Sequence, residues 1–319
     1  MNWKASLCER MHLKPTEFFM GLIAFAALIV DTALVLFKGV TLDFAGYAGI
    51  ALAGFPMIFV GLYYRISERS ERIASAMICS GMFILFSACL SLFNYLMLPL
   101  TRPTIDVSIT MIDAMLGFNW PDVMAFAAQY PNIVFVMKLA YLSTLPQLAL
   151  LVVILGLSGR ARDLHVMLTS VTITATLTIC FWGVFPTLGA KSLYNVSPEI
   201  WQIINPPVNR EYALDLIRVA REGASYITPS EIRGLIAFPS YHAVLSFTAI
   251  YAAWNLKVIG PIYLLINLLI LPGIFIHGGH HFIDLPAGFL MFAFGTWLAR
   301  RAVHDDYIRY NLPSYIIAR

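Results

Sequence analysis

The sequence is poor in charged residues. Only 12% of its 319 residues are Asp, Glu, Lys or Arg, about half the share found in soluble domains. Hydrophobic residues make up 59%, and the mean hydropathy is +0.76. This balance excludes an ordinary soluble protein and predicts an all-α polytopic membrane protein.

Other features are scarce as well. The four cysteines lie in the N-terminal tail or inside apolar segments, without the spacing of a disulfide framework or a metal site. The net charge of +3 is small and dispersed, so nucleic acid is not an expected partner. No short apolar region followed by a small-residue cleavage site is visible near the N-terminus, so we expect no removable signal peptide.

What the sequence has is long apolar runs. A bilayer core of about 30 Å requires roughly 20 apolar residues per helix, and about eight segments approach this length. They cover residues 17–37, 44–64, 74–99, 132–157, 165–186, 239–256, 259–277 and 283–301. We therefore expect about eight transmembrane helices.

The basic residues of the short connections predict the orientation, because cytoplasmic loops carry more Lys and Arg. With the N-terminus in the cytoplasm, the inside loops and tails collect Lys4, Arg10, Lys14, Arg65, Arg69, Arg72, Arg160, Arg162, Lys257, Arg300, Arg301, Arg309 and Arg319. Both termini are then cytoplasmic. The polar segments near 186, 239 and 277–284 all fall on the opposite, extracytoplasmic face.

Two outer connections, 100–131 and 187–238, are unusually long. The first contains Trp120 and predicts short amphipathic helices in the membrane interface. In the second, apolar and charged residues alternate with helical periodicity over 211–222. This helix either covers a site as a cap or is a solvated loop helix without a role.

Four of the seven histidines stand where an apolar run meets a polar loop. His280 and Asp284 are four residues apart, a spacing that places both side chains on one face of a helix. The carboxylate then fixes one ring nitrogen and leaves the other as a base or nucleophile. The alternative is an interfacial histidine with Asp284 as a helix cap.

His242 lies just inside a helix that begins at Pro239 and Ser240. Ser240 is expected to cap this helix, whose unpaired N–H groups favour an anion. A histidine beside such a terminus suits a general acid. The alternative is a capped helix with an interfacial histidine.

A metal centre is a third possibility. His277, His280, His281 and Asp284 form one stripe if the helix is continuous, and they resemble the His-x-x-His-His box of di-iron membrane oxidoreductases. Those enzymes require about eight histidines in several boxes. Here His12, His165 and His304 are expected on the other side of the bilayer, and Gly278 and Gly279 interrupt the helix. We therefore expect no metal and no cofactor.

These motifs resemble a family. Pro239-Ser240-Tyr241-His242 is similar to the second signature of the type 2 phosphatidic acid phosphatase superfamily, and Gly279–Asp284, followed by Gly288, is similar to the third. The bulky residue before His242 is closer to the inositol-phosphotransferase branch, which includes inositol phosphorylceramide synthase. The resemblance covers roughly residues 75–301.

The resemblance implies a division of the chain into three parts. Residues 1–73 would be an N-terminal tail with two accessory helices. Residues 74–302 would be a six-helix catalytic core that includes both outer loops. Residues 303–319 would be a cytoplasmic tail.

The resemblance also implies a mechanism. His280 would attack phosphorus and form a phospho-histidine, Asp284 would orient it, and His242 would protonate the leaving alkoxide. The expected substrate is a lipid phosphate or phospholipid in the bilayer. Water would make the enzyme a phosphatase, and an alcohol or glycan acceptor would make it a phosphotransferase.

The basic residues depart from the family pattern. The Lys-x6-Arg-Pro signature is absent, and Ile274 occupies the place of an expected arginine. Cations are still required to neutralise the transferred phosphoryl group. The predicted phosphate-binding residues are Ser240, Tyr241, Lys191, Arg233, Lys138 and Gly279.

Two functional classes remain open besides the di-iron oxidoreductase. The first is a membrane-embedded lipid phosphatase or phosphotransferase, expected in a bacterial inner membrane with its active site in the periplasm. The second is a lipid transporter or binding protein that kept the fold and lost the chemistry. The missing family cations favour the second class.

Overall fold

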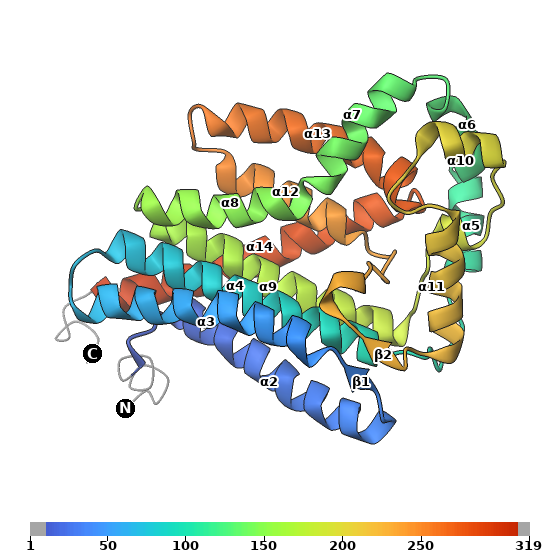
Figure 1. Ribbon diagram of the computed structural model, residues 1–319. Helices are drawn as coiled ribbons and strands as arrows, with labels where there is room; N and C mark the ends of the chain where they lie inside the picture. The colour runs from blue at the N-terminus through green and yellow to red at the C-terminus, as the bar shows by residue number, and fades with distance from the viewer. Residues whose placement is uncertain (1–10, 312–319) are drawn as a thin grey trace.

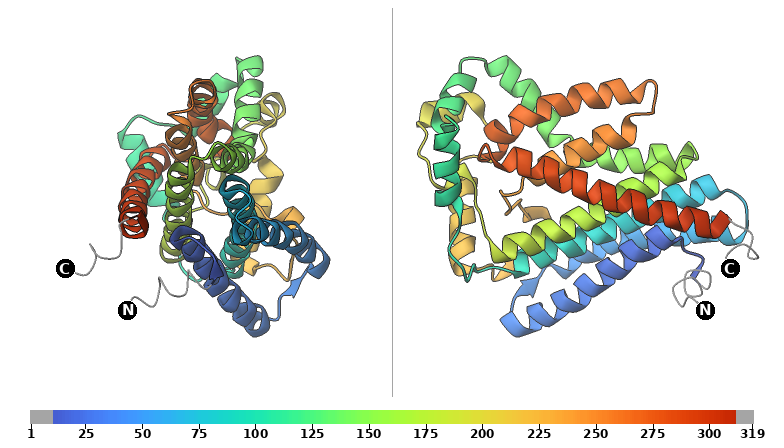
Figure 2. Two further views of the ribbon diagram at one scale, coloured as in Figure 1. Left: turned by 90° about the vertical axis from the view of Figure 1, so that its left-hand side faces the viewer. Right: turned by 180° about the vertical axis from the view of Figure 1, so that it is seen from behind.

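The computed structural model describes residues 11–311, with side chains described as far as residue 304. A bundle of long helices is covered at one end by a layer of shorter ones, and both ends of the described chain lie at the opposite end (Figures 1 and 2). The prediction of an all-α polytopic membrane protein is confirmed. In the described part, strands are limited to two residues each.

The bundle consists of eight helices in the described part. They are α2 (Pro15–Lys38), α3 (Phe44–Ile66), α4 (Glu71–Leu96), α8 (Thr144–Leu157), α9 (Ala161–Val184), α12 (Tyr241–Ala253), α13 (Ile259–Gly278) and α14 (Asp284–Asn311). The shorter elements are α5 (Asp106–Met115), α6 (Trp120–Ala127), α7 (Pro131–Leu142), η1 (Ala190–Ser192), α10 (Pro198–Ile204), α11 (Arg210–Glu222) and η2 (Pro229–Glu231), with β1 (Thr41–Leu42) and β2 (Tyr226–Ile227).

The predicted number of eight spans is not confirmed. Five described helices are long and apolar enough to cross a membrane, namely α2, α3, α4, α9 and α13. A sixth span results if α6 and α7, which meet at a bend of 113°, count as one. Helix α12 has only 13 residues, or about 20 Å of rise, and is too short to span alone.

The predicted helix 132–157 is wrong as a single element, because it is divided into α7 and α8 at Ser143. Pro146 explains the break, since it has no N–H to donate to the carbonyl of Leu142 and its ring crowds the preceding turn. The predicted start of a tail at residue 303 falls inside α14. Residues 1–10 and 312–319 of the predicted tails lie outside the described part.

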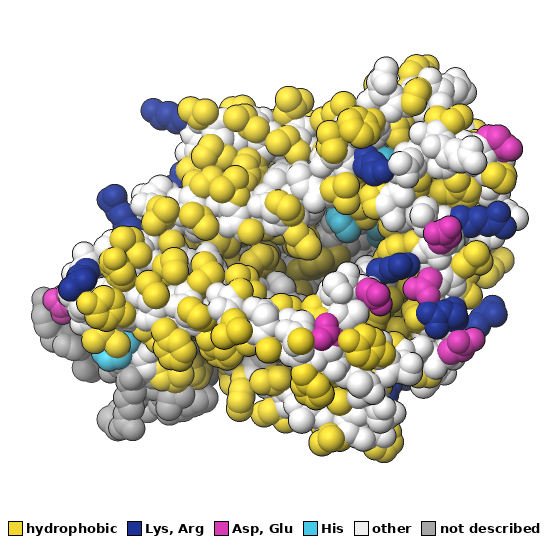
Figure 3. All heavy atoms as spheres, in the orientation of Figure 1, with side chains coloured by type: hydrophobic (Ala, Val, Ile, Leu, Met, Phe, Trp, Pro, Cys, Tyr) yellow, Lys and Arg dark blue, Asp and Glu magenta, His cyan; other side chains and the backbone are white. Residues whose placement is uncertain are grey.

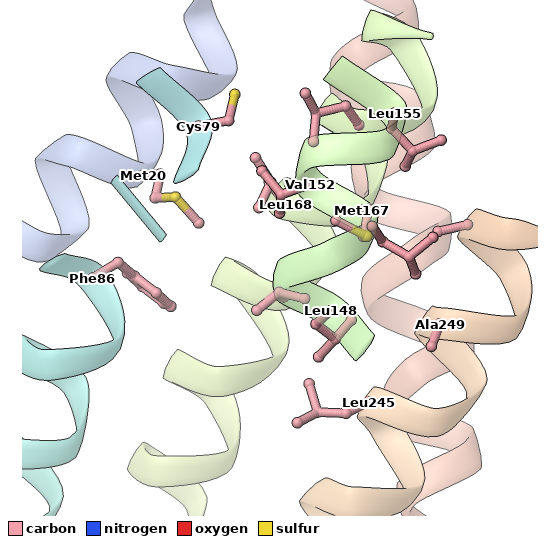
Figure 4. Packing of buried hydrophobic residues seen from close by; sticks show 14 of the residues in the cluster. Met20, Cys79, Phe86, Leu148, Val152, Leu155, Met167, Leu168, Leu245 and Ala249 are labelled. Carbon is pink, nitrogen blue, oxygen red and sulfur yellow. The ribbon is translucent and has the colours of Figure 1, made fainter. Parts of the chain in front are cut away.

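The largest core cluster joins α2, α4, α8, α9 and α12. Figure 4 shows Leu148, Val152 and Leu155 of α8 facing Met167 and Leu168 of α9. In a bilayer such contacts stabilise by close packing, because lipid is as apolar as the side chains. Small residues allow this closeness: a Cβ on Gly156 would lie only 2.7 Å from the Cα of Ala76.

The two predicted accessory helices pack on one flank of this core. Helices α2 and α3 both lie against α4, and Glu17 accepts two hydrogen bonds from Arg65 at 2.6 and 2.9 Å. Glu17 is buried, so this ion pair fixes α2 to α3 at the end of the bundle where the termini lie. At the other end, β1, which connects α2 to α3, pairs with β2. This pairing joins the two helices to the segment 187–238.

The short helices predicted in the two long connections are present. Helices α5 and α6 occupy the first long connection, and α11 covers the predicted 211–222 with its apolar side buried. Together with α10 they form the layer across the end of the bundle (Figures 1 and 2). We call this layer, with the segment 187–238, the cap.

Candidate active site

The two histidine motifs meet beneath the cap. The N–H of Ser240, the residue that caps α12, donates a 3.0 Å hydrogen bond to the carbonyl of Asp284, the first residue of α14. Gly288 allows this approach, because a Cβ there would lie 2.6 Å from the carbonyl oxygen of Ser240. The loop 279–283 and the start of α12 therefore form one surface, and the side chain of Ser240 serves as the predicted cap.

His280 and Asp284 are paired. Nδ1 of His280 lies 2.9 Å from Oδ2 of Asp284, and both side chains are buried. The same carboxylate oxygen accepts the backbone N–H of His281 at 2.9 Å. A carboxylate partner fixes the proton on Nδ1, so Nε2 is the ring nitrogen that can act as a nucleophile. The backbone of Ala237 also forms a hydrogen bond with this imidazole.

The electrostatic surroundings keep this imidazole neutral. Burial, together with the charge of Lys191, holds the pKa of His280 well below its usual range. A neutral ring is the reactive form of a histidine nucleophile, because a protonated ring has no lone pair to offer.

His242 lies close enough to His280 for their charges to interact. Its ring stacks on Tyr141 of α7 at 4.2 Å, and its Nδ1 lies 3.3 Å from the Tyr141 hydroxyl. A Cβ on Gly278 would lie 3.1 Å both from this hydroxyl and from Nε2 of His280. The His280 ring packs directly against Gly278, because a Cβ there would lie only 2.6 Å from Cδ2 of His280. Gly278 thus lies between His280 and the Tyr141 hydroxyl that contacts His242.

Lys191 of η1 supplies a cation at the same place. Its Nζ donates a 3.1 Å hydrogen bond to the carbonyl of Gly278, and the side chain is buried. Burial lowers the pKa of Lys191 to about 8. Gly279 makes room, since its φ of +65° is unfavourable for other residues and a Cβ there would lie 2.7 Å from Cβ of Lys191.

Two carboxylates of α5 hold the site together from the cap. Asp106 accepts the backbone N–H groups of Leu188 and Gly189 at 2.9–3.1 Å. Asp113 accepts those of Phe282 and Ile283 at 3.0 and 3.2 Å. The segment before Lys191 and the loop after His280 are thus both fixed to the same short helix.

His281 lies between these two carboxylates. Its Nδ1 is 3.1 Å from Asp113 and its Nε2 is 3.5 Å from Asp106. Burial alone would lower the pKa of His281, but Asp106, Asp284 and Asp113 raise it above the usual value. The imidazole thus serves as a positive counter-charge to the surrounding carboxylates.

Three residues predicted to bind phosphate have their polar groups elsewhere. The hydroxyl of Tyr241 donates to the carbonyl of Val171 in α9. The guanidinium of Arg233 is partly exposed, pairs with Asp215 at 3.4 Å and lies over a tyrosine ring of α11. Nζ of Lys138 donates to the carbonyl of Asn205. Sequence position alone could not show these partners, because each lies on a different element of the cap or bundle.

The stripe expected of a metal-binding helix is not formed. Helix α13 ends at Gly278 and α14 begins at Asp284. His277 is hydrogen-bonded to the carbonyl of Val134 at 2.9 Å, whereas His280 and His281 have separate carboxylate partners. The three imidazoles therefore do not converge on one point.

The sequence prediction missed three residues of the site. Asp106 and Asp113 are seven residues apart and so share one face of a helix, a signal that could have indicated a common role. Tyr141 carries no such signal, because it reaches His242 only through the packing of α7 against α13 and the neighbouring α12.

The fold and the site define a multi-pass membrane protein in which histidines, an aspartate and a lysine meet at one end of the bundle. The sequence profile of the PAP2 superfamily matches residues 107–298, which is more than half of the chain. The chain belongs to this superfamily, whose members are phosphatases and phosphotransferases. No curated protein and no solved structure matches the chain.

The α5 carboxylates generate a first prediction. Asp113→Ala removes the acceptor of two backbone N–H groups and of His281, all of them in or beside the loop 281–283. Unsatisfied buried groups cost about 1–3 kcal/mol each, so we expect roughly 2–4 kcal/mol of destabilisation. Thermal unfolding in detergent measures this loss.

Asp122→Ala is the matched control, because Asp122 is an exposed carboxylate on the neighbouring helix α6. The Asp122→Ala variant should have the same unfolding temperature as the wild type. Equal unfolding temperatures for both variants would contradict the role given to Asp113.

Proposed function

We propose that this protein is an enzyme that cleaves or transfers a phosphate ester of a lipid-linked substrate through a phospho-histidine on His280. The observation that carries the proposal is the group of polar side chains gathered around Gly278. Nε2 of His280, the Tyr141–His242 pair and the buried cation of Lys191 all lie there.

The chemistry follows from the roles of these groups. Nε2 of neutral His280 attacks phosphorus, so that an N–P bond forms and the bond from phosphorus to the lipid oxygen breaks. The negative charge of the bound phosphate favours the protonated form of His242, which gives its proton to the leaving alkoxide. Asp284, bonded to Nδ1, stabilises the positive charge that develops on the His280 ring.

The second half of the reaction breaks down the phospho-histidine and restores the free enzyme. His242, now neutral, takes a proton from water or from an alcohol, whose oxygen attacks phosphorus. The N–P bond breaks and its electron pair returns to Nε2 of His280. The acceptor decides between a phosphatase and a phosphotransferase, and none of these steps requires a metal ion.

Lys191 compensates in part for the missing family cations. A positive charge beside the attacked phosphorus stabilises the equatorial oxygens in the transition state. The same charge is attracted by Asp284 and helps to keep the nucleophile His280 neutral. This arrangement favours catalysis over a transporter or binding protein that lost the chemistry.

A hollow supports a substrate that comes from the bilayer. Figure 3 shows it on one flank of the molecule, with apolar side chains around it and histidine visible inside. A lipid tail can lie along such a surface while its phosphate reaches the site. By the distribution of basic residues, we place the site at the extracytoplasmic face of a bacterial inner membrane, with the termini in the cytoplasm.

The choice of acceptor rests on the cap. The large cap covers the site and limits the access of water, which supports an alcohol or glycan acceptor and the inositol-phosphotransferase-like branch. Tyr241, the residue that suggested this branch from sequence, points to Val171 and adds no further support.

Substitution of the two histidines tests the proposal. In purified protein supplied with a panel of lipid phosphates, His242→Ala should lower phosphate release or transfer by about 10²–10⁴-fold. His280→Ala should abolish it. The activity should persist in the presence of a chelator.

His12→Ala is the control, because this exposed histidine precedes α2 and lies beside Arg65, at the end of the bundle away from the cap. It should retain full activity. Wild-type rates in the His280 variant would refute the mechanism, and stoichiometric iron together with chelator sensitivity would restore the oxidoreductase alternative.

The pKa of Lys191 gives a second test of the proposal. Burial lowers this pKa from its usual value to about 8, so the charged form is present below pH 8 and is lost as the pH rises through 8. KM for the lipid phosphate should therefore increase about tenfold between pH 7 and 9. The measurement is KM against pH.

Lys191→Arg provides the comparison, because arginine stays charged over this range. Its KM should remain level between pH 7 and 9. A wild-type KM that is independent of pH, or the same rise in the arginine variant, would show that Lys191 does not bind the phosphate.

A further inference from the structure

A second charged cleft lies at the far end of α14 from the candidate active site. Its volume is about 540 Å³. Its lining includes three basic residues, Arg162, Arg300 and Arg301, and the aromatic rings of Tyr251, Phe292 and Trp297. Arg300 is sixteen residues after Asp284, or about 24 Å along the helix, so the two sites are separate.

The guanidinium groups of this cleft have no carboxylate partner among the described side chains. Asp163, the acidic neighbour of Arg162, is paired with Arg160. Arg301 lies over the ring of Trp297 at 4.1 Å and therefore keeps its charge inside the cleft. Three like charges held close together repel one another unless an anion lies between them.

The aromatic wall continues into the hydrophobic surface of the bundle. Phe292 packs on Phe247 and Phe289 with ring centroids 5.7 and 6.1 Å apart. On the same helix, Phe294 stacks on Trp297, and both rings are about half exposed. Figure 2 shows α14 along the rear face of the molecule. A ligand in the cleft thus meets cations at one end and lipid-facing rings at the other.

We propose that this cleft binds the anionic headgroup of a membrane phospholipid from the leaflet opposite to the active site. The three arginines contact the phosphate, and the acyl chains lie along Phe292 and Phe294. Trp297 marks the boundary between headgroup and hydrocarbon, as tryptophan does at membrane interfaces. A free phosphate ion would use the cations and leave the aromatic wall unexplained, which favours the lipid.

The position of Trp297 provides a reporter for the test. The full-length protein is placed in vesicles of phosphatidylcholine that contain either brominated phosphatidylglycerol or brominated phosphatidylcholine. Bromine quenches tryptophan on contact, and the difference between wild type and Trp297→Phe isolates the signal of Trp297. We expect quenching by the anionic lipid at about a hundredfold lower mole fraction than by the zwitterionic lipid, since each of three basic residues contributes about fivefold.

The variant Arg162→Gln/Arg300→Gln/Arg301→Gln should abolish this preference, because each basic residue contributes about fivefold to the attraction of an anionic lipid. Arg301→Gln alone should weaken the preference for the anionic lipid about fivefold. This single variant tests the proposal if the triple variant does not fold. The control is Arg69→Gln/Arg72→Gln, which removes two exposed charges at the α3–α4 connection. It should keep the preference.

Three results would overturn the proposal. Equal quenching by the two lipids would show that the cleft does not select charge. A preference that persists in the triple variant would place the lipid elsewhere. Competition by millimolar inorganic phosphate, strong enough to remove quenching, would show a site for the free ion.

Discussion

The site depends on a single buried carboxylic residue, Asp284. Its backbone carbonyl accepts the N–H of Ser240, and its side chain accepts His280 and the N–H of His281. A buried carboxylate is unfavourable unless donors surround it, so the chain must bring these donors together for the fold to form. In doing so it joins the start of α12 to the start of α14 and leaves Nε2 of His280 as the nitrogen that does not contact the Asp284 carboxylate.

The cap extends this constraint. Asp106 and Asp113 bind backbone N–H groups on two separate segments, which places Lys191 and the loop after His280 on one rigid support. The cap is therefore part of the site and more than a cover. Catalytic groups need this rigidity, because small displacements of a nucleophile greatly reduce the rate. His242, on the other side of the site, is held in place by Tyr141 of α7, which stacks on its ring and contacts its Nδ1.

The sequence predicted those features that depend on near neighbours. The His280–Asp284 pair has a spacing of four and forms, and Ser240 caps α12 as expected. Features that depend on distant elements could not be read from the sequence. The cations Arg233 and Lys138 are bound by cap residues, and Tyr141 enters the site only through helix packing. The break of the predicted helix 132–157 into α7 and α8 is a different case. Pro146 is visible in the sequence, and its missing N–H was sufficient to predict this break.

The central claim is that His280 carries the phosphoryl group between substrate and acceptor. The most direct measurement is to mix the enzyme with a phosphate-labelled substrate that has a good leaving group, to quench in alkali and to locate the label by peptide mass spectrometry. An acid-labile, alkali-stable label on His280 is expected, at a higher level in His242→Ala because its removal by water is slowed. No label, or a label on His242 or His281, would contradict the account.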